Sequence, residues 1–178
     1  MCWQQDVRSR LPIFTALDTD PALLDAHERN FVANIREHGW FTTHVGAEQG
    51  KPAFSYTTGF WLRFEFPELI VFGLQSRVAH DTYWHMYQEL QAGKRFGIGI
   101  REGDIFQNLP AVLLPVAPQY YREHLGWSRW FYGNDDFLCL QLIFPDISAQ
   151  FPWESSSEGF RAVQPDLTAG GWSGRLRH

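Results

Sequence analysis

Residues 51–74, KPAFSYTTGFWLRFEFPELIVFGL, constrain the fold more than any other stretch of the chain. Large and small side chains alternate over 53–60, which predicts a strand. The run 69–74 is apolar on both faces, as is typical of a strand inside a sheet. A short aromatic connection joins the two. We therefore expect two adjoining interior strands, in which Tyr56, Thr57 and Glu68 are the most deeply embedded polar groups.

The overall composition indicates one globular domain. The chain has 178 residues, of which 44% are hydrophobic and 16% aromatic, enough for a single domain with a substantial core. Its net charge is −5 at pH 7, and no run of Lys and Arg is longer than two residues. Nucleic acid is therefore not expected as a partner.

The chain shows no pattern typical of secretion or membrane insertion. Residues 1–10, MCWQQDVRSR, lack the apolar core of a signal peptide, and no apolar run approaches the roughly 18 residues that span a bilayer. The cysteines are Cys2 and Cys139, a pair that predicts neither a disulfide framework nor a zinc site. We expect a soluble cytoplasmic protein with no membrane partner.

Capping residues and apolar periodicity predict two main helices. Asp20 and Pro21 favour a helix start and Gly39 a helix end, which predicts a helix over 21–38. A second helix is predicted over 76–91, with a broad aromatic face. Strands are predicted over 40–45, 53–60, 69–74, 96–100, 111–116 and 137–144.

This order of elements predicts the α+β class, with a mainly antiparallel sheet of about six strands and the two helices packed on it. The domain is expected to span residues 18–167. A flexible N-terminal arm over 1–17 and a flexible C-terminal tail over 168–178 are expected to flank it.

Six motifs resemble a known family. The bacterial family called domain of unknown function 4262 (DUF4262) is similar over roughly residues 29–167, with the motifs in the same order and spacing. The resemblance implies a small cytoplasmic bacterial protein and carries no activity with it. Members usually have Gly-His where this chain has Glu65 and Phe66, so a mechanism that needs that histidine is not expected here. The motifs are HGW at 38–40, PAFSYTTGF at 52–60, PELIVFGL at 67–74, LQLIFPD at 140–146, FPWE at 151–154 and QPDL at 164–167.

The polar residues of the organising strands have a structural and a functional interpretation. A buried Tyr56 usually satisfies its hydroxyl within the core, and Thr57 fits the opposite face of the strand. In the functional interpretation Thr57 lines a hollow between small side chains. Glu68 either accepts hydrogen bonds from neighbouring amides or, if buried, has a raised pKa and acts as a general acid or base. The structural interpretation is favoured for each.

Three further residues complete the candidate ligand or partner site. Gln141 lies within an apolar strand, where an unpaired amide costs about 1 to 3 kcal/mol, so a hydrogen-bond partner is expected. Asp146 follows a proline and is typical of a turn. Trp153 belongs to an aromatic loop beside Glu154. The seven histidines form no metal-binding pattern, so no metal site is predicted, and no catalytic residue or cofactor is assigned.

Two functions from different classes remain open at this stage. The leading hypothesis is a noncatalytic binding module for a protein partner, of immunity or regulatory type, or for a small ligand. The alternative is a small-molecule enzyme or a flavin-type cofactor binder, with a pocket near Tyr56, Glu68 and Trp153. A third hypothesis is self-association through Trp84, Trp127 and Trp130.

Overall fold

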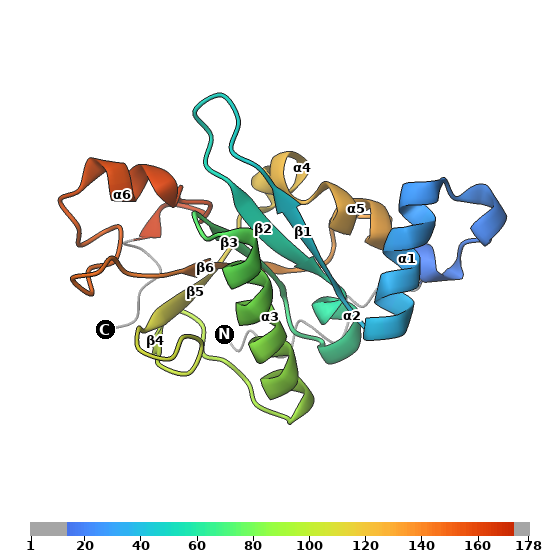
Figure 1. Ribbon diagram of the computed structural model, residues 1–178, viewed down its shortest axis with the longest axis horizontal. Helices are drawn as coiled ribbons and strands as arrows, with labels where there is room; N and C mark the ends of the chain where they lie inside the picture. Colours follow the sequence, from blue (N-terminus) through green and yellow to red (C-terminus); the bar gives the residue numbers. More distant parts are fainter. Residues whose placement is uncertain (1–13, 173–178) are drawn as a thin grey trace.

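The computed structural model describes residues 14–172 and centres on a six-stranded sheet in the order β1-β2-β3-β6-β5-β4 (Figure 1). All neighbouring strands are antiparallel except β3 and β6, which run parallel in the middle of the sheet. The predicted α+β class is confirmed, but the sheet is mixed. The strands are β1 Phe41–Val45, β2 Phe54–Thr58, β3 Glu68–Phe72, β4 Arg101–Glu102, β5 Ala111–Pro115 and β6 Cys139–Ile143.

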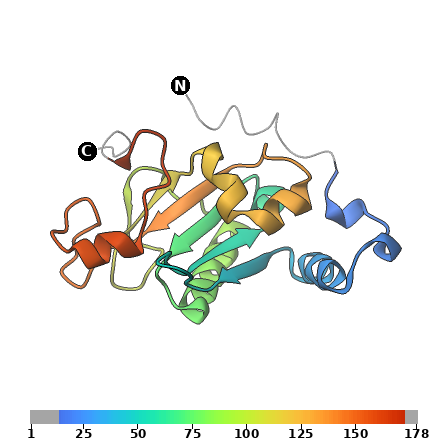
Figure 2. The ribbon, with the colours of Figure 1, turned by 90° about the horizontal axis from the view of Figure 1, so that it is seen from above.

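Helices cover both faces of the sheet (Figure 2). The long helix α3, Ser76–Gln91, lies on one face and has the predicted bounds. The short helices α4, Tyr121–His124, and α5, Gly126–Tyr132, lie on the other. Helix α1, Ala26–His38, packs beside the edge strand β1. Between β3 and β6 the chain passes through α3, β4, β5, α4 and α5. A connection of this length allows β6 to lie parallel to β3.

The remaining helices are short. Helix α2, Phe60–Phe64, is the aromatic connection between β2 and β3, and α6, Glu158–Val163, precedes the C-terminal segment. In the described part of the chain, 3-10 turns span Ala16–Asp18, Pro21–Leu23 and Pro118–Tyr120.

The first helix begins later than the sequence predicts. Asp20 does cap a turn, but that turn is the 3-10 helix Pro21–Leu23. Asp25 then forms a capping box with Glu28, in which each side chain accepts a hydrogen bond from the other residue's amide. This second cap starts α1 at Ala26. The helix ends as predicted, at Gly39 with φ +85°.

The predicted strand 96–100 does not form. Its place is taken by an irregular segment that leads into the two-residue strand β4. Gly99 has φ +74°, outside the extended region, and the amide of Gly97 bonds to the side chain of Glu102 instead of to a neighbouring strand. The amide of Gly99 still donates to the carbonyl of Leu113 in β5 at 2.9 Å, so the segment stays beside the sheet but forms no continuous ladder with it.

Side chains of β3 divide the core into two layers. Leu69 and Val71 face α3, while Ile70 and Phe72 face the layer that contains Phe31, Tyr121 and Phe131. Both layers are almost entirely apolar, so β3 is buried on both faces, as the sequence predicts.

The predicted arm over 1–17 and tail over 168–178 lie partly outside the described residues, so both stay predictions. Of the tail, Thr168 forms an isolated bridge with Val116, and the amide of Trp172 donates to Asp166. Within residues 14–172, no helix combines the length and the apolar character needed to cross a membrane.

Candidate functional site

Glu68 is the first residue of β3, and its side chain is fully buried. Its Oε1 accepts hydrogen bonds from the amides of Gly59 at 2.7 Å and Trp61 at 3.1 Å, and from the hydroxyl of Tyr132. Its Oε2 accepts from the Thr57 hydroxyl at 2.6 Å. The two amides belong to the first turn of α2, so the carboxylate of β3 caps a helix of the preceding connection.

The Glu68 carboxyl is held by hydrogen bonds and not by a cation. Within the described residues, none of the ion pairs includes Glu68. Burial raises the pKa of Glu68, and the hydrogen bonds from Thr57, Tyr132 and the two amides offset part of that rise. A general acid or base must reach its substrate, whereas Glu68 is sealed among its donors. This geometry supports the structural interpretation.

Tyr56 and Thr57 are buried neighbours in β2 that serve different contacts. The Tyr56 hydroxyl accepts a hydrogen bond from the amide of Trp127 at 3.1 Å, which ties β2 to α5. Thr57 Oγ1 donates to Glu68 and accepts from the amide of Leu69 at 2.9 Å. Thr57 therefore contacts Glu68, whereas the hydroxyl of Tyr56 has its own hydrogen-bond partner in α5.

Gln141 anchors the C-terminal segment to the sheet. It is fully buried in β6, where it lies opposite Ile70 of β3. Its amide nitrogen donates to the carbonyl of Pro165 at 2.6 Å, and its carbonyl oxygen accepts from the amide of Leu167 at 3.1 Å. The expected partner is thus the backbone of the chain itself.

Asp146 and Trp153 lie in the loop after β6, apart from Glu68. The Asp146 carboxylate accepts from the amides of Ser148 and Gln150, as a turn residue does. Trp153 stacks on Phe151 with ring centroids 4.8 Å apart, in a small apolar cluster distinct from the two main layers. The predicted site residues therefore occupy four separate places: Tyr56 against α5, Thr57 with Glu68, Gln141 with the C-terminal segment, and Asp146 and Trp153 in the loop.

A concave surface lies elsewhere, between the end of α1, β1 and α3. It encloses about 440 Å³, within the range of small-molecule sites. We call it the aromatic hollow; it is lined by Asn34, His38, Trp40, Phe41, Thr42, His80 and Trp84.

Within the aromatic hollow, the rings of His80 and Trp84 are nearly parallel to that of Trp40. The plane of Trp40 is tilted by 17° from that of His80 and by 14° from that of Trp84, with centroid distances of 5.3 and 6.4 Å. Tyr87 stacks against both tryptophans, at 5.7 Å from each. Trp40 is buried, whereas Trp84 is 45% exposed. The hollow thus presents one accessible tryptophan supported by a buried aromatic stack.

Local hydrogen bonds hold two histidines near this surface. His80 Nδ1 lies 3.2 Å from the hydroxyl of Thr42, and His44 Nδ1 lies 2.7 Å from that of Ser55. Burial lowers the pKa of His44, and the nearby His80 lowers it further. His44 therefore favours the neutral form, and its serine partner is buried in β2.

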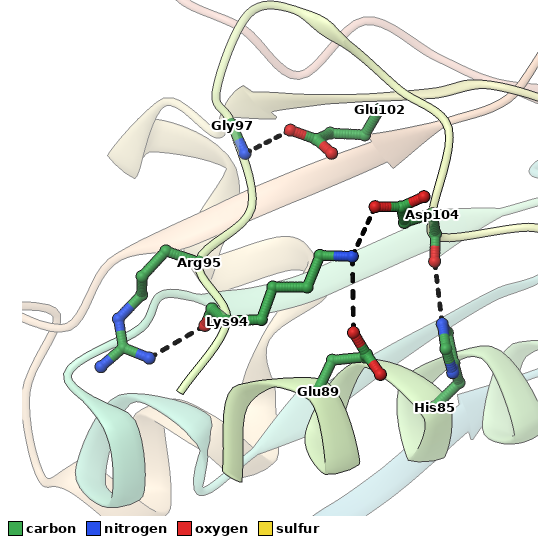
Figure 3. A network of polar contacts seen from close by, with 7 residues as sticks. All are labelled: His85, Glu89, Lys94, Arg95, Gly97, Glu102 and Asp104. Atoms are coloured by element: carbon green, nitrogen blue, oxygen red, sulfur yellow. Dashed lines mark hydrogen bonds and ion pairs between the residues drawn. The ribbon is translucent and has the colours of Figure 1, made fainter. Parts of the chain in front are cut away.

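A second hollow, of about 900 Å³, lies on the other side of α3 and contains a polar network (Figure 3). Lys94 bridges Asp104 at 2.6 Å and Glu89 at 3.4 Å, and His85 Nε2 lies 2.8 Å from the Asp104 carbonyl oxygen. The hydrogen bond with Asp104 raises the pKa of Lys94, with Glu89 adding to the rise. Lys94 is therefore a paired cation and not an amine nucleophile.

Sequence reasoning did not select the aromatic hollow. The sequence places Trp84 on the aromatic face of the second predicted helix, but the functional hypothesis for Trp84 is self-association, together with Trp127 and Trp130, which are half-buried and pack against the core. A signal was present in the spacing of His80, Trp84 and Tyr87, which places them on one stripe of a helix. The position of Trp40 beneath that stripe follows only from the fold.

Fold and site together define an α+β domain with a mixed sheet and one aromatic hollow beside its edge strand. The family model described as Domain of unknown function (DUF4262) matches residues 34–158, so the chain belongs to this family, as its motifs predict. The matched region includes every residue that lines the aromatic hollow. No curated protein and no solved structure matches the chain.

Proposed function

We propose that this protein is a noncatalytic binding module that holds a small, ring-containing organic ligand in the aromatic hollow. The observation that carries the proposal is the exposed Trp84 at the rim of a hollow of ligand size, beside the buried Trp40. Exposing a tryptophan to water is unfavourable, and such exposure beside a concavity is typical of a binding surface.

The chemistry of the lining supports binding more than catalysis. Its side chains offer two imidazoles, an amide and a hydroxyl, with no carboxylate, thiol or amine among them. The Thr42 hydroxyl does lie beside His80, but the lining has no acidic group to orient that imidazole, as an activated nucleophile usually requires.

The alternative of an enzyme or flavin-type site near Tyr56, Glu68 and Trp153 has less support. Glu68 is enclosed by donors from its own chain, and Trp153 belongs to a different apolar cluster. None of the three lines either hollow described above. We therefore place the ligand at the aromatic hollow.

The proposal is tested by recording indole and imidazole signals in nuclear magnetic resonance spectra during titration with indole, benzimidazole and cyclohexanol. We expect at least one compound to shift the signals of Trp40, Trp84 and His80 while those of Trp153 stay in place. After prolonged incubation with the protein, the compound should have an unchanged mass in mass spectrometry.

A pair of substitutions locates the binding site. Trp84→Ala should abolish the shifts, whereas Trp153→Ala should leave them intact. Shifts that gather around Trp153, or that survive Trp84→Ala, would place the ligand outside the aromatic hollow and refute the proposal. If the protein converts a bound compound chemically, and Trp84→Ala abolishes that conversion, the claim that the module is noncatalytic is refuted.

A further inference from the structure

We infer that the aromatic hollow takes a flat, uncharged nitrogen heterocycle of nucleobase type, which lies parallel to Trp84. This inference rests on the proposed function and specifies its ligand. Its first support is the common orientation of the rings: His80 and Trp84 are each within 17° of the Trp40 plane. A flat ring that adopts the same orientation can extend the existing stack.

The same orientation disfavours a quaternary ammonium ligand. A cation of that shape is bound by aromatic faces that surround it from several directions. Here the ring planes of Trp40 and Trp84 differ by only 14°, so they offer one direction of approach. In addition, no carboxylate lines the hollow to compensate a positive charge.

The charge of the lining also disfavours an anionic ligand. Phosphate groups are recognised by arginine, lysine or a row of backbone amides. Neither arginine nor lysine lines the aromatic hollow. A heterocyclic base or its nucleoside therefore fits the hollow better than the corresponding nucleotide.

The polar groups of the lining complement the edge of an amino heterocycle. The Asn34 side-chain nitrogen donates to the carbonyl of Asn30 at 2.8 Å, which leaves its side-chain oxygen to accept from a ligand amine. His80 uses Nδ1 toward Thr42, which leaves Nε2 for a ring nitrogen. A heterocycle with an amine beside a ring nitrogen can use both groups.

Isothermal titration calorimetry of the full chain tests the inference with defined probes. Adenine and adenosine should bind, and adenosine 5′-monophosphate should bind no more tightly than adenosine. Indole, which is flat but lacks the amine and the ring acceptor, should bind about 5-fold more weakly than adenine. Tetramethylammonium and cyclohexanol should bind at least about 10-fold more weakly.

Substitutions at the stacking residue separate binding from folding. Trp84→Ala should weaken adenine binding by about 5-fold to 100-fold, while Trp84→Phe should retain most of it. Trp153→Ala should not change it. The inference is overturned if tetramethylammonium or the nucleotide binds most tightly, or if Trp84→Ala leaves adenine binding unchanged.

The two proposals fail in distinguishable ways. If cyclohexanol produces Trp84-dependent shifts and adenine binds nowhere, the proposed function stands and the heterocycle inference is wrong. If none of these probes shifts the signals of Trp84, both the proposed function and the heterocycle inference are wrong. Circular dichroism of each variant should match that of the unsubstituted protein, which excludes unfolding as the cause of lost binding.

Discussion

The hydroxyl of Tyr132 donates a hydrogen bond to the carboxylate of Glu68 across 64 residues of sequence. Tyr132 ends α5 and Glu68 begins β3, so this contact joins the helical layer to the centre of the sheet. Burial, followed by the neighbouring Glu68 charge, raises the pKa of the tyrosine well above its usual value. Tyr132 therefore remains a donor throughout the ordinary pH range.

The Glu68 contact predicts a pH-dependent cost for Tyr132→Phe. The native pKa of Glu68 is raised, so its contribution to stability is fully present below the ordinary glutamate pKa and is lost as pH rises through the native pKa. Removing a donor to the carboxylate raises that pKa further. We expect Tyr132→Phe to cost about 1 to 3 kcal/mol at pH 8 and less at pH 5, measured by denaturant unfolding.

The control for this prediction is Tyr83→Phe. The Tyr83 hydroxyl is equally buried but donates to the carbonyl of Ser55, which does not titrate. Its cost should therefore be the same at pH 5 and pH 8. Equal costs at both pH values for Tyr132→Phe would show that Glu68 keeps the same ionisation state in the folded protein at pH 5 and pH 8, which would contradict the prediction.

Gly59 is predicted to resist any side chain. Its φ is +118°, and a Cβ atom there would lie 2.5 Å from the carbonyl oxygen of Gly39 and 2.8 Å from the Cα of Trp40. Gly59→Ala should therefore destabilise the protein by more than about 2 kcal/mol in thermal or denaturant unfolding. Gly46→Ala, where a Cβ meets nothing within 4 Å, should change stability little.

Gln141 is predicted to hold the C-terminal segment in place. Gln141→Leu keeps a similar volume but leaves the Leu167 amide and the Pro165 carbonyl without their partner. We expect a loss of about 1 to 3 kcal/mol and faster hydrogen exchange at Leu167. Gln150→Leu, on the exposed part of the following loop, should affect neither measurement. Unchanged exchange in Gln141→Leu would contradict the anchoring role.

The two tryptophans of the aromatic hollow should differ in their effect on stability. Trp40 is 4% exposed and packs against Phe60 and Tyr87, so Trp40→Ala should cost about 3 to 5 kcal/mol. Trp84 is 45% exposed, and Trp84→Ala should cost less than about 1.5 kcal/mol. Denaturant unfolding of both variants compares them. A similar cost for both would indicate that Trp84 serves packing.

The sequence predicts elements well where local signals agree. Helix α3 has the predicted bounds, because a glycine stop follows a long periodic pattern. The burial of Tyr56, Glu68 and Gln141 also follows from their apolar neighbours. By contrast, Gly99 interrupts a strand pattern in residues 96–100, because its effect depends on a φ of +74° that residue type alone does not determine.

The candidate site was harder to predict because its residues come from distant parts of the chain. Trp40 and Trp84 stack through a contact between β1 and α3 that no local pattern encodes. Likewise, Glu68 is predicted to be buried, but its donor Tyr132 could not be identified without the packing of α5. Each buried polar residue requires a hydrogen-bond partner, and for Tyr56, Glu68 and Gln141 that partner lies within the same chain.

The parallel pairing of β3 with β6 has a consequence for synthesis on the ribosome. Strands β1, β2 and β3 emerge early and can pair as a meander, but the outer edge of β3 stays unpaired until residue 143 has left the exit tunnel. After Glu68, the strand consists of four apolar residues, Leu69 to Phe72. Because an unpaired strand edge can pair with another chain, the nascent chain carries an aggregation-prone segment until β6 is available to cover it.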